Sequence, residues 1–255
     1  DISDRDLAIL AQICYEDIPS GTRLDTLSST YPSYANSITS AFKEAAILEE
    51  MKGWKVFKTH YSKGGLQIAV FEKDGQLVFA CRGSEDKDVW YKSAEFWKDW
   101  IVADGLGWLT GFNAQAPAAK SFVKKVMNQY TSYDVFVTGH SLGGNVAYNL
   151  ASKALDVDSG RVKKINTYNG LGLLFGITLG LTDVVDEYRL VNNAEKIKDY
   201  HIEGDPVFPL SIFHYGEHIK LSMCEGAYGA HDLYSFFVHL PRYKNSSNAG
   251  GGGSW

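Results

Sequence analysis

The sequence predicts an α/β fold built on a mixed, mostly parallel sheet. The first observation is a set of three short β-runs at residues 54–61, 67–72 and 77–81, which Gly64-Gly65 and Asp74-Gly75 separate as hairpin turns. The second is the alternation of β-runs with amphipathic helical segments from residue 114 onward, which is typical of parallel strands joined by helices. Together they predict a sheet with a parallel middle and helices on its flanks.

Helical spacing and turn residues bound the remaining elements. We expect helices at residues 4–17 and 37–51, ahead of the three β-runs. The later elements, in chain order, are a helix at 114–130, a β-run at 133–138, a helix after residue 141, β-runs at 162–168 and 197–202, an edge strand at 219–223 and a helix at 232–239. Active sites of open α/β sheets gather at the carboxyl ends of the strands, so residues that follow a strand are the first candidates.

Length and composition favour one domain. The chain has 255 residues, 45% of them hydrophobic, which suits one α/β domain over residues 1–244 with an ample core. Residues 245–255 are glycine-rich and read as a flexible tail or linker. A formal net charge of −5 argues against nucleic acid as a partner. The longest apolar stretch, residues 170–181, is too short to span a bilayer.

The three cysteines predict no metal site or disulfide framework. Cys81 lies inside a β-run and is expected to be a small core residue. A disulfide between Cys14 and Cys224 is left open by the sequence.

The pentapeptide Gly139-His140-Ser141-Leu142-Gly143 lies between a buried β-run and an amphipathic helix. In this context a Gly-x-Ser-x-Gly turn presents a serine on a strained backbone, with its Oγ exposed and the next N–H aimed at the substrate. The glycines leave room where a Cβ would strike the neighbouring strand or helix. The pattern predicts a nucleophile elbow at Ser141. The alternative is a glycine-rich turn in which Ser141 only caps the helix.

A nucleophilic serine needs an imidazole base and a carboxylate that fixes the tautomer of that base. Asp205 follows the β-run at 197–202, and His231 lies at a loop-to-helix junction. The chain order Ser141, Asp205, His231 is that of α/β-hydrolases, so these three are the predicted triad. The alternatives in the same stretch are the carboxylates of Asp183, Asp199 and Glu203 and the imidazoles of His201, His214, His218 and His239. His140 is too close to Ser141 in sequence to act as the base.

Attack by a serine on a carbonyl also requires donors for the developing oxyanion. The N–H of Leu142, directly after the serine, is one candidate. Ser84 is the other, because the Arg82-Gly83-Ser84 turn directly follows the β-run at 77–81. An ordinary Gly-Ser turn is the alternative for this segment.

Five segments in order resemble class 3 lipases, which have an α/β-hydrolase fold. The segments are Arg82-Gly83-Ser84, Trp100-Ile101-Val102-Ala103-Asp104, residues 139–144, Gly204-Asp205-Pro206-Val207 and Ala230-His231-Asp232-Leu233-Tyr234. A poorly characterised bacterial branch is the most similar, with Tyr168-Asn169-Gly170 as a further match. The resemblance covers roughly residues 2–243.

The resemblance implies Ser141 as nucleophile, Asp205 as orienting carboxylate and His231 as base. It also implies Ser84 and Leu142 as oxyanion donors, and ester hydrolysis with neither a metal nor an organic cofactor. In fungal class 3 lipases a short lid follows the position of Ser84. Here residues 85–98 form a longer and highly charged stretch, which puts equivalence of the lid in doubt.

Two apolar segments are candidates for substrate contact. Trp97, Trp100, Ile101 and Trp108 would form an apolar stripe on a helix interrupted at Gly105. This stripe is either a lid that opens at a lipid surface or a helix packed on the sheet. Leu173, Leu174 and Phe175 belong to residues 170–181, which either wall an acyl-chain pocket or form an ordinary buried segment.

The sequence thus predicts a serine carboxylic-ester hydrolase of lipase or phospholipase A type, with a lipid or other ester as substrate and transient contact with a lipid interface. One alternative is an esterase, thioesterase or peptidase for small soluble substrates, and another is a non-catalytic binding module on the same fold. The chain begins Asp1-Ile2-Ser3, which suggests a removed leader or an excised domain. A secreted bacterial enzyme or effector domain is therefore expected rather than a cytoplasmic protein.

Overall fold

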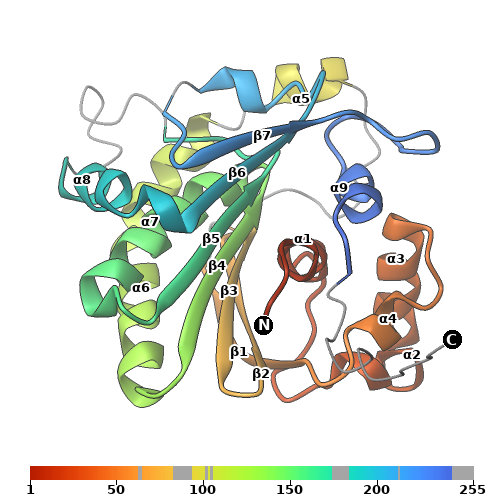
Figure 1. Cartoon of the computed structure of the whole chain (residues 1–255), viewed down its shortest axis with the longest axis horizontal. Helices are drawn as coiled ribbons and strands as arrows, with labels where there is room; N and C mark the ends of the chain where they lie inside the picture. The colour runs from red at the N-terminus through yellow and green to blue at the C-terminus, as the bar shows by residue number, and fades with distance from the viewer. Residues whose placement is uncertain are drawn as a thin grey trace, which may run out of the picture.

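One mixed sheet organises the described part of the chain, with seven strands in the order β1-β2-β3-β4-β5-β6-β7 (Figure 1). The computed structural model describes residues 1–62, 65–82, 94–100, 103, 106–173, 184–211 and 213–242, except for the side chains of residues 94, 97, 98, 106 and 108–113. The predicted α/β class, with a mixed and mostly parallel sheet flanked by helices, is confirmed.

The sheet is antiparallel at its start and parallel thereafter. β1 (Lys55–Tyr61), β2 (Gln67–Lys73) and β3 (Gln76–Arg82) pair antiparallel. β3 then pairs parallel with β4 (Asp134–His140), followed by β5 (Val162–Tyr168), β6 (Ile197–Ile202) and β7 (Glu217–Leu221). The β2–β3 hairpin turns at Asp74 and Gly75, both with positive φ, as a two-residue Asp-Gly turn requires.

Helices cover both faces of the sheet (Figure 1). α6 (Leu106–Gln129), α7 (Leu142–Asp158) and α8 (Val184–Asn192) lie on one side. α1 (Asp4–Ile13), α3 (Pro32–Phe42), α4 (Ile47–Glu50) and α9 (Tyr234–His239) lie on the other. The shorter elements of the described residues include α2 (Leu27–Thr30), α5 (Ala94–Trp100) and 3-10 helices at Leu24–Thr26, Ala194–Lys196 and Phe208–Leu210. Each face of the sheet therefore buries its own hydrophobic cluster.

Three helices differ from the sequence-based expectation. The single helix expected at 37–51 is wrong, because Lys43 takes a left-handed φ of 51° that closes α3, and α4 begins afresh at Ile47. α1 begins at Asp4 as predicted, with a capping box from Ser3 and Asp6. It ends at Ile13 instead of residue 17. α6 begins eight residues before the predicted start and continues through Pro117.

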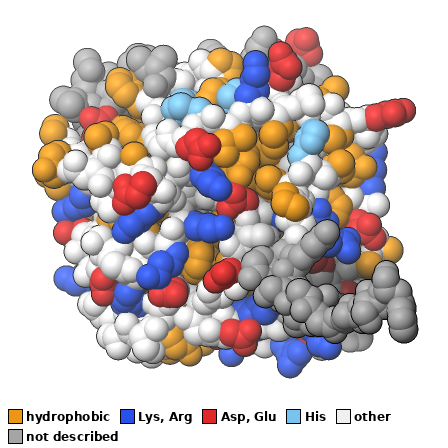
Figure 2. Space-filling model, in the orientation of Figure 1, with side chains coloured by type: hydrophobic (Ala, Val, Ile, Leu, Met, Phe, Trp, Pro, Cys, Tyr) orange, Lys and Arg blue, Asp and Glu red, His pale blue; other side chains and the backbone are white. Residues whose placement is uncertain are grey.

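The surface of the face in Figure 2 is mixed in character. Acidic and basic side chains are interspersed on it, and hydrophobic side chains gather in the region of β7 and α9. Met223 and Val238 are exposed there, while Ile219 and Leu221 are partly buried against the core. None of the described helices is long and apolar enough to cross a bilayer. No disulfide joins Cys14 and Cys224 in the structure.

Candidate active site

Ser141 lies on a tight turn between the end of β4 and the start of α7. Its backbone has φ 57° and ψ −127°, a conformation that is costly for a residue with a Cβ. A Cβ on Gly139 would lie 2.2 Å from the carbonyl oxygen of Gly143, and one on Gly143 would lie 2.1 Å from that of Cys81. Only glycine fits at either position, which is the steric requirement that the sequence motif predicted.

The predicted triad residues meet in a continuous chain of hydrogen bonds. His231 Nδ1 lies 2.6 Å from Asp205 Oδ1, and His231 Nε2 lies 2.9 Å from Ser141 Oγ. A carboxylate only accepts, so Nδ1 carries a proton and its N–H donates a hydrogen bond to Asp205 Oδ1. In the neutral imidazole Nε2 is then an acceptor, and the Ser141 hydroxyl donates to it. This is the arrangement in which a histidine can remove the proton of a serine.

Main-chain contacts hold the carboxylate in place. Asp205 lies in the loop after β6, and its second oxygen accepts the N–H of Phe208 at 2.7 Å. Its own N–H donates to the carbonyl oxygen of Ile202 at 3.0 Å. Both carboxylate oxygens are therefore engaged, one by His231 and one by the backbone, which restricts rotation of the group.

Asp232 shapes the loop that carries His231. Its two carboxylate oxygens accept the N–H groups of Gly229 and Tyr234, each at 2.8 Å, on either side of His231. Burial raises the pKa of Asp232, although these backbone hydrogen bonds oppose the shift. His231 is thus fixed by a local turn directly before α9.

His140, which the sequence placed only in the elbow, contacts the proposed base. Its Nε2 lies 2.7 Å from the carbonyl oxygen of His231, and its Nδ1 lies 3.0 Å from the hydroxyl of Tyr15. Burial, together with the nearby His231, lowers the pKa of His140 to about 3. His140 is therefore neutral, with Nε2–H as donor and Nδ1 as acceptor of the Tyr15 hydroxyl.

The alternative triad residues have other partners. Asp199 is fully buried, with His214 Nδ1 and His218 Nδ1 at 2.8 and 3.1 Å from its carboxylate. His201 stacks on the ring of Phe208, with centroids 3.9 Å apart. The remaining described alternatives, His239 and Glu203, contact Ser222 and Lys220. None of these is placed against Ser141, and Asp183 lies outside the described residues.

The other predicted site residues are only partly described. Leu142 is buried, and its N–H belongs to the first turn of α7, at the positive end of the helix dipole. Leu173 is buried and bridges to Phe213. Trp100 is half-buried in α5. Trp97 and Trp108 belong to α5 and α6, but their side chains, like all of Ser84, Ile101, Leu174 and Phe175, lie outside what the structure describes.

Ser141 is 0% exposed, and His231 is 3% exposed. A hydroxyl that water does not reach is also closed to an ester. In this structure the Ser141 hydroxyl is therefore enclosed by protein.

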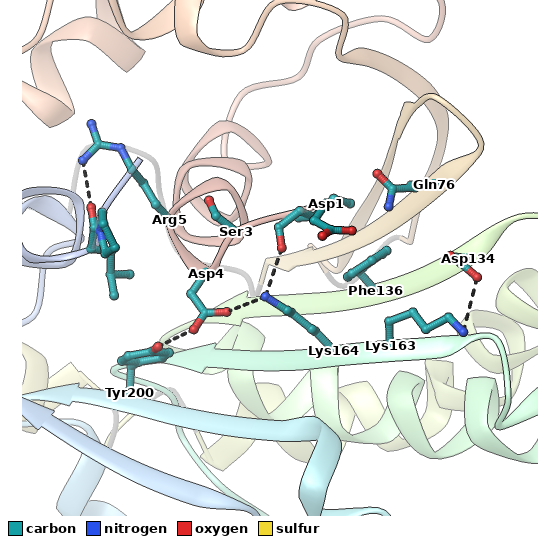
Figure 3. A pocket seen from close by; sticks show the side chains of 13 residues that line it. Asp1, Ser3, Asp4, Arg5, Gln76, Asp134, Phe136, Lys163, Lys164 and Tyr200 are labelled. Carbon is teal, nitrogen blue, oxygen red and sulfur yellow. Dashed lines mark hydrogen bonds and ion pairs between the residues drawn. The ribbon is translucent and has the colours of Figure 1, made fainter. Parts of the chain in front are cut away.

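A large cavity lies at the opposite end of the sheet (Figure 3). It has a volume of about 630 Å³, and Gln76 and Asp134, the first residues of β3 and β4, line it. Figure 3 shows Lys164 and Tyr200 pointing toward Asp4, to which both are hydrogen-bonded. Lys164 pairs with Asp4 and Lys163 with Asp134 in its lining, and the lining does not include the serine.

No metal site accompanies the triad in the described residues, where no cluster of three or more His, Cys, Asp or Glu side chains has the geometry to hold an ion.

Part of the chain matches a known protein family in sequence. Residues 78–168 match the family model described as Lipase (class 3). No curated protein matches the chain in sequence. The matched segment begins within β3, continues through α5, α6, β4, the serine elbow and α7, and ends with β5. It has the pattern of the class 3 lipase family.

The fold is similar to that of solved fungal lipases. A mutant form of MDLA from Penicillium cyclopium is 17% identical, with a TM-score of 0.54 over 89% of this chain and 84% of that one. A member of a family of fungal lipases with an unusual buried polar cluster is 16% identical, with a TM-score of 0.51 over 91% and 86%. A triacylglycerol lipase whose catalytic centre is a serine protease triad is 16% identical, with a TM-score of 0.50 over 79% and 70%. At such identities the likeness is one of fold.

Proposed function

We propose that this protein is a serine carboxylic-ester hydrolase of lipase or phospholipase A type, with Ser141, His231 and Asp205 as its triad. The observation that carries the proposal is the continuous hydrogen-bonded chain from Ser141 Oγ through the His231 ring to the Asp205 carboxylate. The class 3 lipase pattern in residues 78–168 supports ester hydrolysis as the reaction.

The geometry supports a two-step acyl transfer. Ser141 Oγ attacks the ester carbonyl carbon while His231 Nε2 takes the hydroxyl proton, and Asp205 stabilises the resulting imidazolium. The tetrahedral intermediate places its negative oxygen at the N–H of Leu142, with Ser84 as the proposed second donor. When the ester C–O bond breaks, His231 returns the proton to the departing alcohol.

Water completes the cycle. It attacks the acyl-Ser141 carbonyl and gives a proton to His231 Nε2, which passes it to Ser141 Oγ as the fatty acid leaves. The full burial of Ser141 supports the further proposal that a covering segment moves before substrate enters. The tryptophan-containing stripe around Trp100 is the proposed covering segment, with the acyl chain beside Leu173.

The test combines covalent labelling with lipid analysis. A fluorophosphonate probe should label the wild-type protein at Ser141 and leave Ser141→Ala unlabelled. The same pair, incubated with mixed phospholipids and triacylglycerols, should differ in released fatty acid, and the lipid that disappears identifies the head group. Equal fatty-acid release by the two proteins would contradict the triad.

Chain-length dependence separates the two kinds of esterase. A lipase should prefer long-chain p-nitrophenyl esters and gain activity above the solubility limit of the substrate. A preference for short soluble esters without that gain would identify an esterase for small substrates instead.

A further inference from the structure

Asn169 lies where three segments of the active site meet. It follows directly after β5, is fully buried, and has a left-handed φ of 46°. Glycine adopts this backbone more easily, while asparagine is one of the few other residues that tolerates it. The contacts of the Asn169 side chain should therefore explain why an asparagine and not a glycine occupies this position.

The amide nitrogen of Asn169 holds the loop that carries His231. Nδ2 donates to the carbonyl oxygen of Ala230 at 2.8 Å and to that of His231 at 3.0 Å. The carbonyl of Asp232, at 3.5 Å, lies at the limit of hydrogen bonding. Carbonyl groups only accept, so the nitrogen and not the oxygen of the amide must face this loop.

The amide oxygen of Asn169 holds the segment that carries Asp205. Oδ1 accepts the N–H of Ile202 at 2.8 Å, and the carbonyl of Ile202 in turn accepts the N–H of Asp205 at 3.0 Å. One side chain thus connects the loop of the base to the strand of the carboxylate. These two segments are otherwise joined at the site by the His231–Asp205 hydrogen bond.

The neighbours of Asn169 hold the nucleophile. The Ser141 N–H donates to the carbonyl oxygen of Tyr168 at 3.4 Å, and the N–H of Leu171 donates to the carbonyl oxygen of Ser141 at 2.9 Å. The segment from Tyr168 to Leu171 therefore contacts all three parts of the site, two through the Asn169 side chain and one through backbone.

We infer that Asn169 is a positioning residue that sets the His231 imidazole between Asp205 and Ser141. It touches neither the substrate nor the reacting atoms and acts through the main chain of His231 and Ile202. The inference rests on the proposed function, because positioning matters for catalysis only if these three residues form the triad. A reacting group displaced by about 1 Å costs on the order of 100-fold in rate, so loss of this brace has a measurable effect.

Two substitutions test the inference. Asn169→Gly removes the amide but suits the left-handed backbone, and Asn169→Asp keeps the shape and the acceptor for Ile202 while removing the amide donor. Asn149→Ala is the matched control, because Asn149 is a buried asparagine whose amide donates to Asn145 within the same helix. Circular dichroism and thermal melts establish that each variant is folded at the assay temperature.

Two measurements are made on each folded protein. With p-nitrophenyl butyrate, both Asn169 variants should lose about 10- to 100-fold in kcat, with KM changed by less than about 3-fold. The low-field proton NMR signal of His231 Nδ1–H should move upfield or broaden in both. Asn149→Ala should match the wild type in kcat and in this signal.

The outcomes that overturn the inference are distinct from those that overturn the proposed function. Folded Asn169 variants with wild-type kcat and an unchanged Nδ1–H signal would refute the positioning role, as would failure of both variants to fold, which would make the role purely structural. Absence of hydrolysis in every version, the wild type included, would count against the proposed function. In that case the NMR signal would still decide whether Asn169 orients the imidazole.

Discussion

The ring of His140 lies against the ring of His231, with centroids 4.8 Å apart, and its Nε2–H donates to the main-chain carbonyl of the same residue. The residue before the proposed nucleophile therefore supports the proposed base. The pair is buried, and the low pKa of His140, about 3, keeps the supporting ring uncharged beside an imidazole that must gain a proton during turnover. A positive charge on His140 would oppose that gain.

Replacement of His140 by phenylalanine should weaken both the fold and the reaction. The ring shape is kept, but the donor to the His231 carbonyl and the acceptor for the Tyr15 hydroxyl are removed. We expect a loss of about 1–3 kcal/mol in the free energy of unfolding, the usual cost of a buried polar group whose partner is removed. Ester hydrolysis should fall by at least about 10-fold.

Tyr15→Phe is the control for this change, because it removes the hydroxyl that contacts His140 and leaves the His140–His231 hydrogen bond intact. Urea unfolding and kcat are measured on both variants. Equal kcat values for His140→Phe and the wild type would show that His231 needs no support from His140.

The convergence of Ser141, Asp205 and His231 could be predicted because each of them has a signature that can be read along the chain. Ser141 has flanking glycines, Asp205 follows a strand, and His231 comes last, before a helix. The residues that hold these three side chains in place, Asn169 and His140, have no such signature. Asn169 and His140 act through main-chain carbonyls 62 and 91 residues away, and hydrogen bonds to backbone depend on where loops meet, not on residue spacing.

Helix boundaries illustrate a second limit. The stretch at 37–51 has continuous helical spacing, but Lys43 adopts a left-handed conformation that ends the helix. A glycine or asparagine at this position would have predicted the helix end from the sequence, whereas a lysine does not. The early start of α6 is the opposite case. Gly107 and Pro117 disfavour helix locally, yet the helix includes both residues.

Alanine at Gly143 should destroy the elbow. The added Cβ would lie 2.1 Å from the carbonyl oxygen of Cys81. That carbonyl belongs to β3, which is paired with β4, so the backbone cannot move away without disturbing the sheet. We expect a loss above about 3 kcal/mol in unfolding free energy, or no soluble protein. Gly160→Ala is the control, because its nearest neighbour is the Asp158 side chain at 3.4 Å, and it should change stability by less than about 0.5 kcal/mol. Stability is measured by thermal melts. A Gly143→Ala protein that is as stable and as active as the wild type would contradict the elbow geometry.

His214 should make stability depend on pH near neutrality. Burial disfavours its charged form, but the Asp199 carboxylate and the carbonyl oxygens of Phe208 and Ser211 outweigh burial and raise the pKa of His214. A raised pKa means that protonated His214 stabilises the fold fully below the ordinary histidine value of about 6.5, and that this contribution fades as pH rises through the folded value. The stability of the wild type should therefore fall between pH 6 and pH 9.

His214→Gln removes the titrating group beside Asp199. Urea unfolding at both pH values should show a larger gap between the wild type and this variant at pH 6 than at pH 9. A gap that is constant, or that grows with pH, would show that His214 is not protonated in the folded protein.

Asp4 should control stability in acid. It joins the start of α1 to the sheet through Tyr200 at 2.5 Å, Lys198 at 2.9 Å and Lys164 at 3.2 Å. Burial would raise its pKa, but these partners outweigh burial and lower the pKa of Asp4 to about 2. A lowered pKa means that the ionised carboxylate stabilises the fold fully above the ordinary value of 3.8 and that this contribution is lost as pH falls toward 2.

The shift in pKa from 3.8 to about 2 corresponds to at most about 2.5 kcal/mol, and solvent screens part of it because the carboxylate is only partly buried, so Asp4→Asn should cost about 1–2 kcal/mol at pH 6. The deficit relative to the wild type should shrink as pH falls from 4 to 2, because the wild-type carboxylate then becomes neutral as well. Asp25→Asn is the control, because Asp25 pairs with the exposed Arg23 at the surface and should contribute less than about 1 kcal/mol. The unfolding free energies of both variants and of the wild type are measured with urea across this pH range. If Asp4→Asn is as much less stable than the wild type at pH 2 as at pH 6, the charge of Asp4 does not hold α1 to β5 and β6.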